Sequence, residues 1–354
     1  MKKLWLSGSM VATLVIASAC GISSEEVSED QADSDTNDDQ EEVSETDTSD
    51  AEYEIQFAHV VNPGTAKGQA ADYFADLLEE RSDGQIAVSV YPDSQLGSDR
   101  EIIEQMQSGT VEMNAPFTGV LPSFVPQYQV YDLPYLFEDR EHAFELSTGE
   151  LGDALNEYLP DQDLRFLGFW DGGFKHFTNS DKPIESLEDM QGLSMRASQS
   201  PLLISQFEAW GASAESIDLN ELYTSLEQGT VDGQENPLSN IVSQSYYEAQ
   251  DYMTYSEHGY MGYPLLISES FYQELPEDLQ ETLHEVADEV NEWQWEVSEQ
   301  SEEEYAETLE EASIEVNELP EEEREEFREA SEEVYDEFRE NIEDGEEILD
   351  IVEN

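Results

Sequence analysis

From residue 53 onward, apolar side chains switch repeatedly between two spacings, and this alternation restricts the fold more than any other feature of the chain. Residues 53–57 alternate apolar and polar side chains as a strand does, whereas residues 66–78 repeat apolar side chains at helical spacing. Residues 86–90 then indicate a second strand, and residues 98–109 a second helix that begins with a capping box. Strands that alternate with helices predict an α/β fold with a mainly parallel sheet.

One short device occurs twice in the chain. Residues 108–116 (SGTVEMNAP) and 228–237 (QGTVDGQENP) each follow a predicted helix. In both segments a Gly ends the helix, Thr-Val and an acidic residue begin a strand, and a Pro ends that strand. Chance similarity of a Gly-Thr-Val motif is the alternative explanation. Two similar α/β halves predict two lobes that face a cleft, with Gly172 and Gly173 as a hinge or crossover between them.

Acidic residues greatly outnumber basic ones. The chain has 86 Asp and Glu against 13 Lys and Arg, which gives a formal net charge of −73. A surface this negative repels a phosphate backbone, which argues against a nucleic-acid partner. Self-repulsion of the carboxylates also strains the compact state, and concentrated salt relieves that strain by screening. We therefore predict a halophilic or salt-tolerant source.

The first twenty residues have the pattern of an export signal. Lys2 and Lys3 precede an apolar run, and small residues stand directly before Cys20, the only cysteine of the chain. This pattern predicts a lipoprotein signal peptide over residues 1–20, with cleavage before Cys20 and lipidation of its thiol; an ordinary secretory signal or an N-terminal membrane anchor are the alternatives. Residues 21–50 are almost wholly polar and acidic, which predicts a disordered linker to an extracytoplasmic domain.

A candidate ligand-binding cation lies on a predicted strand. Ser186 and Asp189 form a capping box for a short helix that Gly192 ends, and residues 193–197 then alternate as a strand that carries Arg196. Pairing with one of the many carboxylates is one interpretation of this arginine. The other is an anion clamp, because a guanidinium is always charged and binds a carboxylate bidentately.

Signatures of catalysis are missing from the sequence. No Gly-x-Ser-x-Gly motif occurs, residues 64–67 are too short for a phosphate-binding loop, and no pair of histidines has metal-ligand spacing. Carboxylate pairs are so numerous that they indicate no particular site. We therefore predict that the protein is not an enzyme and uses no cofactor and no metal. The five histidines are His59, His142, His176, His258 and His284.

Several motifs, in order along the chain, resemble the solute-binding proteins of tripartite ATP-independent periplasmic (TRAP) transporters of the DctP type. The resemblance covers residues 53–340, nearly the whole predicted folded region, and implies a two-lobed, periplasmic-binding-protein-like (Venus flytrap) α/β fold with long C-terminal helices. The motifs that carry it are residues 91–100 (YPDSQLGSDR), 133–137 (LPYLF), 189–196 (DMQGLSMR), 210–213 (WGAS), 222–229 (LYTSLEQG) and 231–237 (VDGQENP).

The resemblance also implies how the lobes divide the chain. Lobe I is expected to comprise residues 51–173 and 262–301. Lobe II is expected to comprise residues 174–261 and 302–354. The chain would therefore cross three times between the lobes.

The family's binding residues can be carried over to matching positions. The resemblance implies that Arg196 holds the ligand carboxylate and that Asn236 adds a hydrogen bond. Lys175 stands where the family has a second arginine, and an ammonium binds as a point charge without the planar fork of a guanidinium. Phe117 stands near a position where some relatives place a polar ligand contact, with Thr118 beside it.

Two further residues are candidate pocket walls. Trp170 and His59 both lie at the ends of predicted strands. Packing in the core is an equally good interpretation of each.

By this resemblance, the protein is an extracytoplasmic receptor, lipid-anchored or periplasmic, that closes around a small organic acid and presents it to the small and large membrane subunits of a permease. A sensory module that presents the acid to a membrane kinase is the main alternative. A secreted enzyme and an ABC-type binding protein are the others, and the Arg196 motif and residues 232–237 argue against the latter.

Overall fold

A computed structural model describes residues 51–353 of the chain. The predicted signal segment with Cys20 and the acidic linker lie outside the described residues. Among the helices that are described, none is long and apolar enough to cross a membrane.

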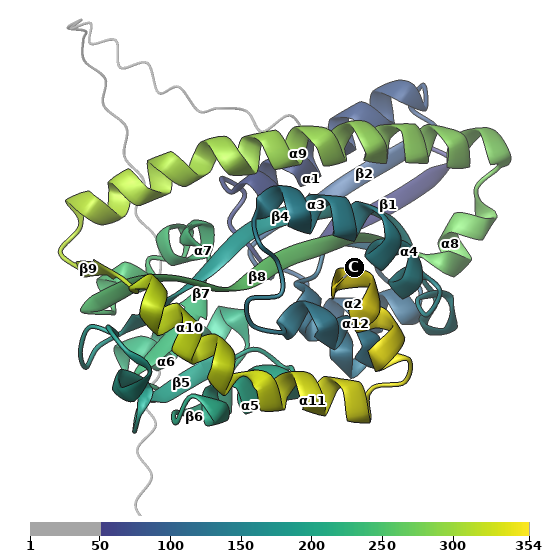
Figure 1. Ribbon diagram of the computed structural model, residues 1–354. Helices are drawn as coiled ribbons and strands as arrows, with labels where there is room; N and C mark the ends of the chain where they lie inside the picture. The colour runs from purple at the N-terminus through teal and green to yellow at the C-terminus, as the bar shows by residue number, and fades with distance from the viewer. Residues whose placement is uncertain (1–50, 354) are drawn as a thin grey trace, which may run out of the picture. The chain divides into compact units, whose positions relative to one another are not determined.

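The nine strands found within residues 51–353 belong to one mixed sheet (Figure 1). Their order is β2-β1-β3-β8-β4-β7-β5-β6, and β9 pairs with the N-terminal end of β8. The strands are β1 (Tyr53–Ala58), β2 (Ile86–Tyr91), β3 (Met113–Asn114), β4 (Leu164–Asn179), β5 (Ser194–Ala197), β6 (Ser213–Ser216), β7 (Gly233–Asn236), β8 (Tyr252–Ser268) and β9 (Glu315–Glu318).

Two similar halves of this sheet meet at the long strands β4 and β8. In the first half, β1 pairs in parallel with β2 and β3, and β3 lies antiparallel to β8. In the second half, β5 pairs in parallel with β6 and β7, and β7 lies antiparallel to β4. We call these sets of strands, each with the adjoining ends of β4 and β8, the first half and the second half. The predicted pair of α/β halves is thereby confirmed.

The repeated sequence device has the same role in both halves. Gly109, at a φ of +71°, ends the turn after α2 and leads to β3, and Gly229, at +63°, follows α6 and leads to β7. A left-handed φ of this kind favours glycine because it has no Cβ. Both strands therefore enter the sheet beside a long antiparallel strand.

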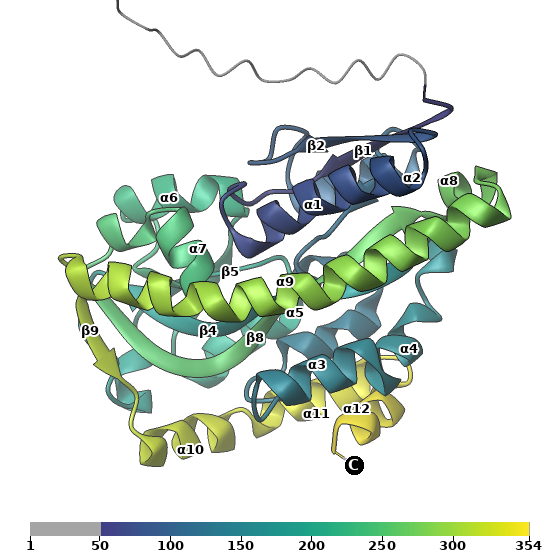
Figure 2. The same cartoon turned by 90° about the horizontal axis from the view of Figure 1, so that it is seen from above.

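Helices cover the sheet, and one of them, α9, runs along both halves (Figures 1 and 2). It contacts α1 in the first half and α7 in the second, and its apolar stripe, from Leu279 through Val290 to Trp295, is buried. The α-helices are α1 (Ala66–Arg81), α2 (Asp99–Gln107), α3 (Arg140–Thr148), α4 (Glu150–Asn156), α5 (Pro201–Ala209), α6 (Leu219–Glu227), α7 (Leu238–Ser243), α8 (Glu269–Glu274), α9 (Glu277–Glu311), α10 (Glu321–Ala330), α11 (Glu332–Asn341) and α12 (Gly345–Glu353).

Short 3₁₀ helices occupy several connections between these elements. The capping boxes expected at Ser98 and Ser186 are both present, the first on α2 and the second on a 3₁₀ helix. The 3₁₀ helices are η1 (Thr118–Ser123), η2 (Pro126–Asp132), η3 (Pro160–Gln162), η4 (Leu187–Met190) and η5 (Tyr246–Glu248).

The expectation of a mainly parallel sheet is wrong at the centre of the molecule. The two longest strands, β4 and β8, pair antiparallel along most of their length, from Leu164↔Ser268 to Asn179↔Tyr252. Residues 164–179 form one continuous strand, which runs through Gly172 and Gly173 where a hinge or crossover was expected. The glycines instead lie at a register shift between Asp171 and Gly173. Three short irregularities in the ladder let strands this long twist and bend while remaining paired.

The expected boundaries between the lobes fall inside continuous elements. Gly173 pairs directly with Met261, so the predicted boundaries in β4 and β8 meet at one rung of the ladder. The third boundary, at residues 301–302, lies within α9. At the C-terminal end, α11 packs on α5 of the second half, whereas α12 packs on α4 and η2.

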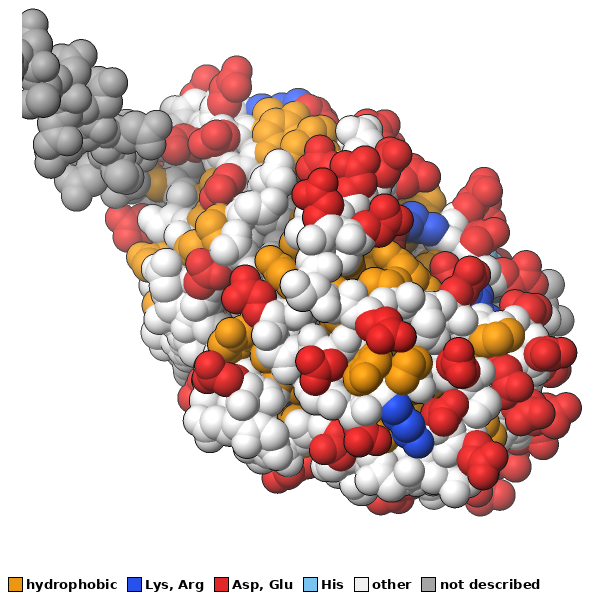
Figure 3. Space-filling model, turned by 90° about the vertical axis from the view of Figure 1, so that its left-hand side faces the viewer, with side chains coloured by type: hydrophobic (Ala, Val, Ile, Leu, Met, Phe, Trp, Pro, Cys, Tyr) orange, Lys and Arg blue, Asp and Glu red, His pale blue; other side chains and the backbone are white. Residues whose placement is uncertain are grey.

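Acidic side chains are numerous at the surface. On the face shown in Figure 3 they far outnumber Lys and Arg, which appear in a few isolated places. This distribution is consistent with the net charge of −73.

Candidate functional site

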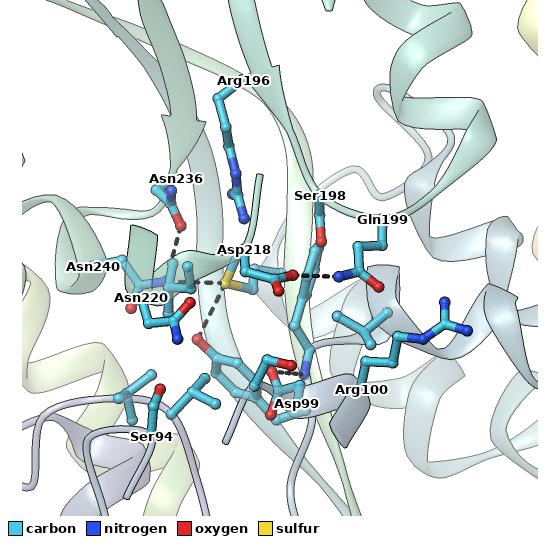
Figure 4. Close-up of a pocket in the computed structure, with 18 residues that line it drawn as sticks. Ser94, Asp99, Arg100, Arg196, Ser198, Gln199, Asp218, Asn220, Asn236 and Asn240 are labelled. Atoms are coloured by element: carbon cyan, nitrogen blue, oxygen red, sulfur yellow. Dashed lines mark hydrogen bonds between the residues drawn. The ribbon is translucent and has the colours of Figure 1, made fainter. Parts of the chain in front are cut away.

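A pocket opens between the two halves, where the parallel strands end. Residues at the ends of β5 and β7, or in the segments that follow β1, β2, β3, β5, β6 and β7, line it, together with Met261 and Tyr263 of β8. The carboxyl ends of parallel strands are the usual place for ligands in α/β sheets, because loops and helix starts converge there. Figure 4 labels its polar lining residues, which are Ser94, Asp99, Arg100, Arg196, Ser198, Gln199, Asp218, Asn220, Asn236 and Asn240.

Arg196 extends from β5 into this pocket (Figure 4). The side chain is nearly inaccessible, with 5% of the residue exposed, and its Nε donates to the carbonyl of Ile217 at 2.8 Å. Within residues 51–353, no carboxylate lies within ion-pairing distance of this guanidinium. Burial lowers the pKa of Arg196, against the opposing effects of Tyr246, Glu235 and Asp218. A buried cation without a counter-charge is costly, so the terminal N–H groups form a site that attracts an anion.

Asn236 lies beside Arg196, on the neighbouring strand. Arg196 is in register with Gln234 of β7, two residues before Asn236. The amide oxygen of Asn236 accepts from Asn240 at 2.9 Å, and its amide nitrogen donates to Gln234. An amide nitrogen carries two donors, so one N–H remains for another partner. The structure therefore brings together the two residues expected to bind the ligand carboxylate.

Acceptor groups complete the polar lining. Asp218 accepts from the amide of Gln199, and Asp99 accepts from the backbone N–H of Phe117 at 3.3 Å. The other Asp99 oxygen, Oδ1, is buried and has no hydrogen-bond partner in the described part of the chain. Burial raises the pKa of Asp99, an effect that Lys67 opposes. These groups suit a ligand that carries donors, such as hydroxyls, next to its anionic group.

Phe117 supplies part of an apolar wall. It is largely buried and lines the pocket with Val60, Val120 and Met261. A Cβ on Gly119 would come within 2.5 Å of the Phe117 ring, so a glycine is needed there to seat it.

Lys175 does not line the pocket. Its ammonium pairs with Glu235 at 2.6 Å and lies 5.9 Å from the centre of the Phe117 ring. The other Glu235 oxygen contacts His258 at 2.7 Å and accepts from Gln206 at 3.0 Å. We call these four residues, Lys175, Glu235, His258 and Gln206, the ion-pair cluster. The cation at the position of the family's second arginine is thus already engaged by the protein.

The other three candidate residues also lie outside the pocket lining. Trp170 is buried in the core, where its indole donates to Asn291 of α9 at 2.8 Å. Thr118 is fully buried. Burial and the charge of Lys67 lower the pKa of His59 to about 3, so its imidazole is neutral at ordinary pH.

Most of the polar lining was missed by sequence reasoning. Asp218 and Asn220 follow a strand of four residues, and nothing in their spacing indicates a site. Ser198 and Gln199 could have been predicted to line the pocket, because they directly follow the strand that carries Arg196. Arg100 stands in the motif of residues 91–100 and in the predicted capping box, and neither pattern indicates that it lines a pocket.

The chemistry of this lining is that of recognition. A buried guanidinium, a free amide N–H and several acceptors surround an apolar wall. No cluster of three or more His, Cys, Asp or Glu that could hold a metal ion occurs among the residues placed by the structure.

A family model described as "Bacterial extracellular solute-binding protein, family 7" (DctP) matches residues 57–341 of the chain. This segment contains every residue that lines the pocket and the whole sheet except the first residues of β1.

Two curated proteins are similar in sequence. The C4-dicarboxylate-binding protein DctB of Bacillus subtilis is 38% identical over 231 residues, 65% of this chain and 66% of that protein. The C4-dicarboxylate-binding periplasmic protein DctP of Rhodobacter capsulatus is 39% identical over 232 residues, 65% of this chain and 69% of that protein. The alignment therefore spans about two thirds of each of these relatives.

Solved structures extend the similarity to almost the whole described fold. A TRAP periplasmic solute-binding protein from Sulfurospirillum deleyianum with bound succinate superimposes with a TM-score of 0.82 at 34% identity, covering 86% of this chain and 99% of that one. The sugar acid binding protein DctPAm from Advenella mimigardefordensis, in complex with galactonate, gives a TM-score of 0.82 at 32% identity, covering 85% and 97%. The predicted two-lobed fold is thereby confirmed.

Proposed function

We propose that this chain, which belongs to the DctP family of bacterial extracellular solute-binding proteins (family 7), is the receptor of a TRAP transporter and binds a small organic acid in the pocket around Arg196. The bound acid is then presented to the membrane permease for ion-coupled uptake. The protein acts by binding and release rather than by catalysis.

The unpaired guanidinium of Arg196 carries this proposal. Each other arginine that is largely buried has a carboxylate partner, such as Asp171 for Arg140. A carboxylate that enters the pocket would supply the missing counter-charge, and exclusion of water would strengthen the attraction as the local dielectric falls. The Asn236 amide would add a hydrogen bond to the same group.

Location and mechanics follow from the same proposal. We propose lipid anchoring through Cys20, with residues 21–50 as a tether, which keeps the receptor at the outer face of the cytoplasmic membrane. We also propose that the chain divides into lobe I and lobe II at residues 173, 261 and 301. A ligand that contacts both lobes stabilises the closed arrangement by its higher affinity for that state.

The test is to weigh whatever acid the purified protein carries. Native mass spectrometry of the wild type, followed by mild denaturation, should release a small organic acid. Arg196→Lys should carry none, because an ammonium lacks the planar fork. Arg196→Ala should lower the affinity for that acid by about 2–5 kcal/mol, or tens to thousands of times.

A matched control separates binding from general charge effects. Arg328 is a partly exposed arginine of α10 that pairs with Glu321 and Glu325 at 3.3 Å, so Arg328→Lys should carry as much acid as the wild type. Normal acid binding by Arg196→Lys would refute the assignment of this residue.

A further inference from the structure

A row of hydrogen-bonded side chains runs from the pocket into the sheet. Asn240 of α7 donates to Asn236 at 2.9 Å (Figure 4), and Asn236 donates to Gln234 of the same strand. Gln234 donates to the hydroxyl of Thr178 on β4 at 2.9 Å, and Thr178 donates to the amide oxygen of Gln250 at 3.1 Å. We call these five residues the polar network. All five are buried, and two of them, Asn236 and Asn240, line the pocket.

Every donation along the polar network runs away from the pocket. An amide group can turn over, which exchanges the positions of its oxygen and its nitrogen, and a hydroxyl can rotate. Each inner member accepts from one neighbour and donates to the next, so all members must reverse together. The polar network therefore has two possible directions, and contacts at one of its ends must select between them.

Contacts at the Gln250 end select the direction. The amide nitrogen of Gln250 donates to the carbonyl of Ala249 at 3.1 Å and to that of Asp232 at 3.4 Å. It also donates at 2.9 Å to the hydroxyl of Ser180, which itself donates to Ala249 at 3.3 Å. A backbone carbonyl can only accept. Turning the Gln250 amide over would place its oxygen against these acceptors, and a buried oxygen without a donor is costly.

Contacts at the pocket end impose no comparable direction. Beyond Asn236, Asn240 donates to the sulfur of Met261 at 3.5 Å, and a thioether is a weak acceptor. The direction selected at Gln250 leaves one N–H of Asn236 free for a ligand. In the reverse direction an amide oxygen would take the place of that nitrogen, and it would repel the carboxylate that Arg196 attracts.

We propose that Gln250 is a positioning residue for the ligand carboxylate, because it fixes the direction of the polar network and thereby makes Asn236 a donor in the pocket. The inference rests on the proposed function, since it explains how one group beside Arg196 is held in the orientation that an acid requires. Gln250 does not line the pocket and acts through two intervening side chains, Thr178 and Gln234.

Calorimetric titration of full-length variants with succinate, galactonate and pyruvate tests the inference, and the acid that the wild type binds most tightly is the probe. Gln250→Lys places an ammonium among the same acceptors, and an ammonium can only donate. The Thr178 hydroxyl then accepts from the lysine and donates to Gln234, so the polar network reverses. The affinity for the probe should fall about tenfold to a hundredfold, as expected for a lost hydrogen bond to a charged group.

Two further variants separate direction from stability. Gln250→Glu still accepts from Thr178 and keeps the direction, although its second oxygen faces carbonyls and should lower the melting temperature. Its affinity for the probe should stay close to that of the wild type. Thr178→Val interrupts the polar network and makes the two directions about equal in energy, so the affinity should fall about twofold.

Gln127→Lys is the matched control for the introduced lysine. Gln127 is 5% exposed, as Gln250 is, and it donates to the backbone carbonyl of Glu343 at 3.4 Å. It belongs neither to the polar network nor to the pocket lining. Gln127→Lys should therefore lower the melting temperature and leave the affinity for the probe unchanged.

Nitrogen-15 NMR spectra test the direction without a ligand. The side-chain NH₂ signal of Asn236 is identified by its loss in Asn236→Asp. This signal should shift in Gln250→Lys, shift less in Thr178→Val and stay near its wild-type position in Gln250→Glu.

The inference is overturned if Gln250→Lys binds the probe as tightly as the wild type, or if Gln250→Glu loses as much affinity as Gln250→Lys; the proposed function survives both results. If Gln250→Lys does not fold, an Asn236 signal unchanged by Thr178→Val overturns the inference. If the wild type binds none of the three acids, the acid that it releases on denaturation serves as the probe. A wild type that also carries no acid overturns the proposed function as well.

Discussion

Arg196 and Lys175 are both buried cations on strands of the sheet, yet their partners differ. Lys175 meets Glu235 at 2.6 Å, and the rest of the ion-pair cluster satisfies the remaining carboxylate oxygen. Within the described residues, Arg196 donates only to the carbonyl of Ile217, and its other N–H groups face a pocket. Burial alone therefore does not identify a ligand-binding cation. The absence of an internal counter-charge, together with an adjoining cavity, does.

Both carboxylate oxygens of Glu235 have partners within the ion-pair cluster. Burial would raise the pKa of Glu235, but Lys175 and His258 outweigh that effect and hold it well below its usual range. Burial lowers the pKa of His258, so its neutral ring donates from Nε2 to Glu235 and accepts from Ser256 at Nδ1, 2.7 Å from the hydroxyl. The same ring stacks on Phe177, with centroids 3.9 Å apart. The cluster thus ties β4, β7 and β8 together.

The largest effect on stability is expected from substitution of Glu235. Glu235→Gln leaves the Lys175 ammonium buried without a counter-charge, so the free energy of unfolding should fall by about 3–5 kcal/mol. Urea unfolding at neutral pH measures it. The double variant Lys175→Met, Glu235→Gln removes both charges and should recover part of the loss. A single variant as stable as the wild type would mean that this pair is not a structural element.

Substitution of Lys67 is expected to raise the free energy of unfolding and not to lower it. Its pKa is about 10.5 when unfolded and about 8 when folded, so below pH 8 the folded state bears the full cost of the buried charge. As pH rises from 8 to 10.5 the unfolded state binds more protons and this cost disappears. Lys67→Met should therefore be more stable than the wild type by about 3 kcal/mol at pH 7, and the gap should close toward pH 10.5.

Denaturant unfolding of both proteins across this pH range measures the gap. The groups that face Lys67 are His59, Asp99 and Tyr263. Burial raises the pKa of Tyr263 well above its usual value, so the tyrosine does not titrate in the pH range over which Lys67 does. A gap that is the same at pH 7 and pH 10.5 would indicate a packing effect of the methionine instead.

The smallest effects are expected from salt, which should act on the charged surface and not on the buried interior. With a net charge of −73, the melting temperature should rise between about 0.1 M and about 2 M salt as surface repulsion is screened. Association with an anionic ligand should quicken in stopped-flow measurements for the same reason. The loss caused by Glu235→Gln should stay constant, because a buried pair is screened little. A melting temperature independent of salt would remove the support for a salt-tolerant source.

Strand and helix periodicity predicted much of this fold, because each half buries one face of its helices on a sheet. Sequence reasoning failed at β4 and β8. Two adjacent glycines, Gly172 and Gly173, usually indicate that a strand ends, but pairing with β8 on both sides of them keeps β4 continuous. Local propensity does not report that long-range pairing, so the antiparallel centre was missed.

The site was predicted where backbone geometry directs a side chain. Arg196 and Asn236 stand on short strands, and strand alternation fixes the face on which they lie. Lys175 also stands on a strand, but its partner Glu235 comes from a strand distant in sequence, so its pairing was invisible. Asp218 and Asn220 come from connections without periodicity.

The three elements that join the halves are continuous, and this determines how the molecule bends. β4 and β8 pass through the centre as paired strands, and α9, with 35 residues, is a rod of about 50 Å that crosses beside them. No flexible loop connects the halves at these crossings, so the halves move by elastic bending of the three elements and not by rotation about a loop. Bending of this kind has a restoring force. Any change in the angle between the halves therefore stores elastic energy, which is released when the halves return to their resting arrangement.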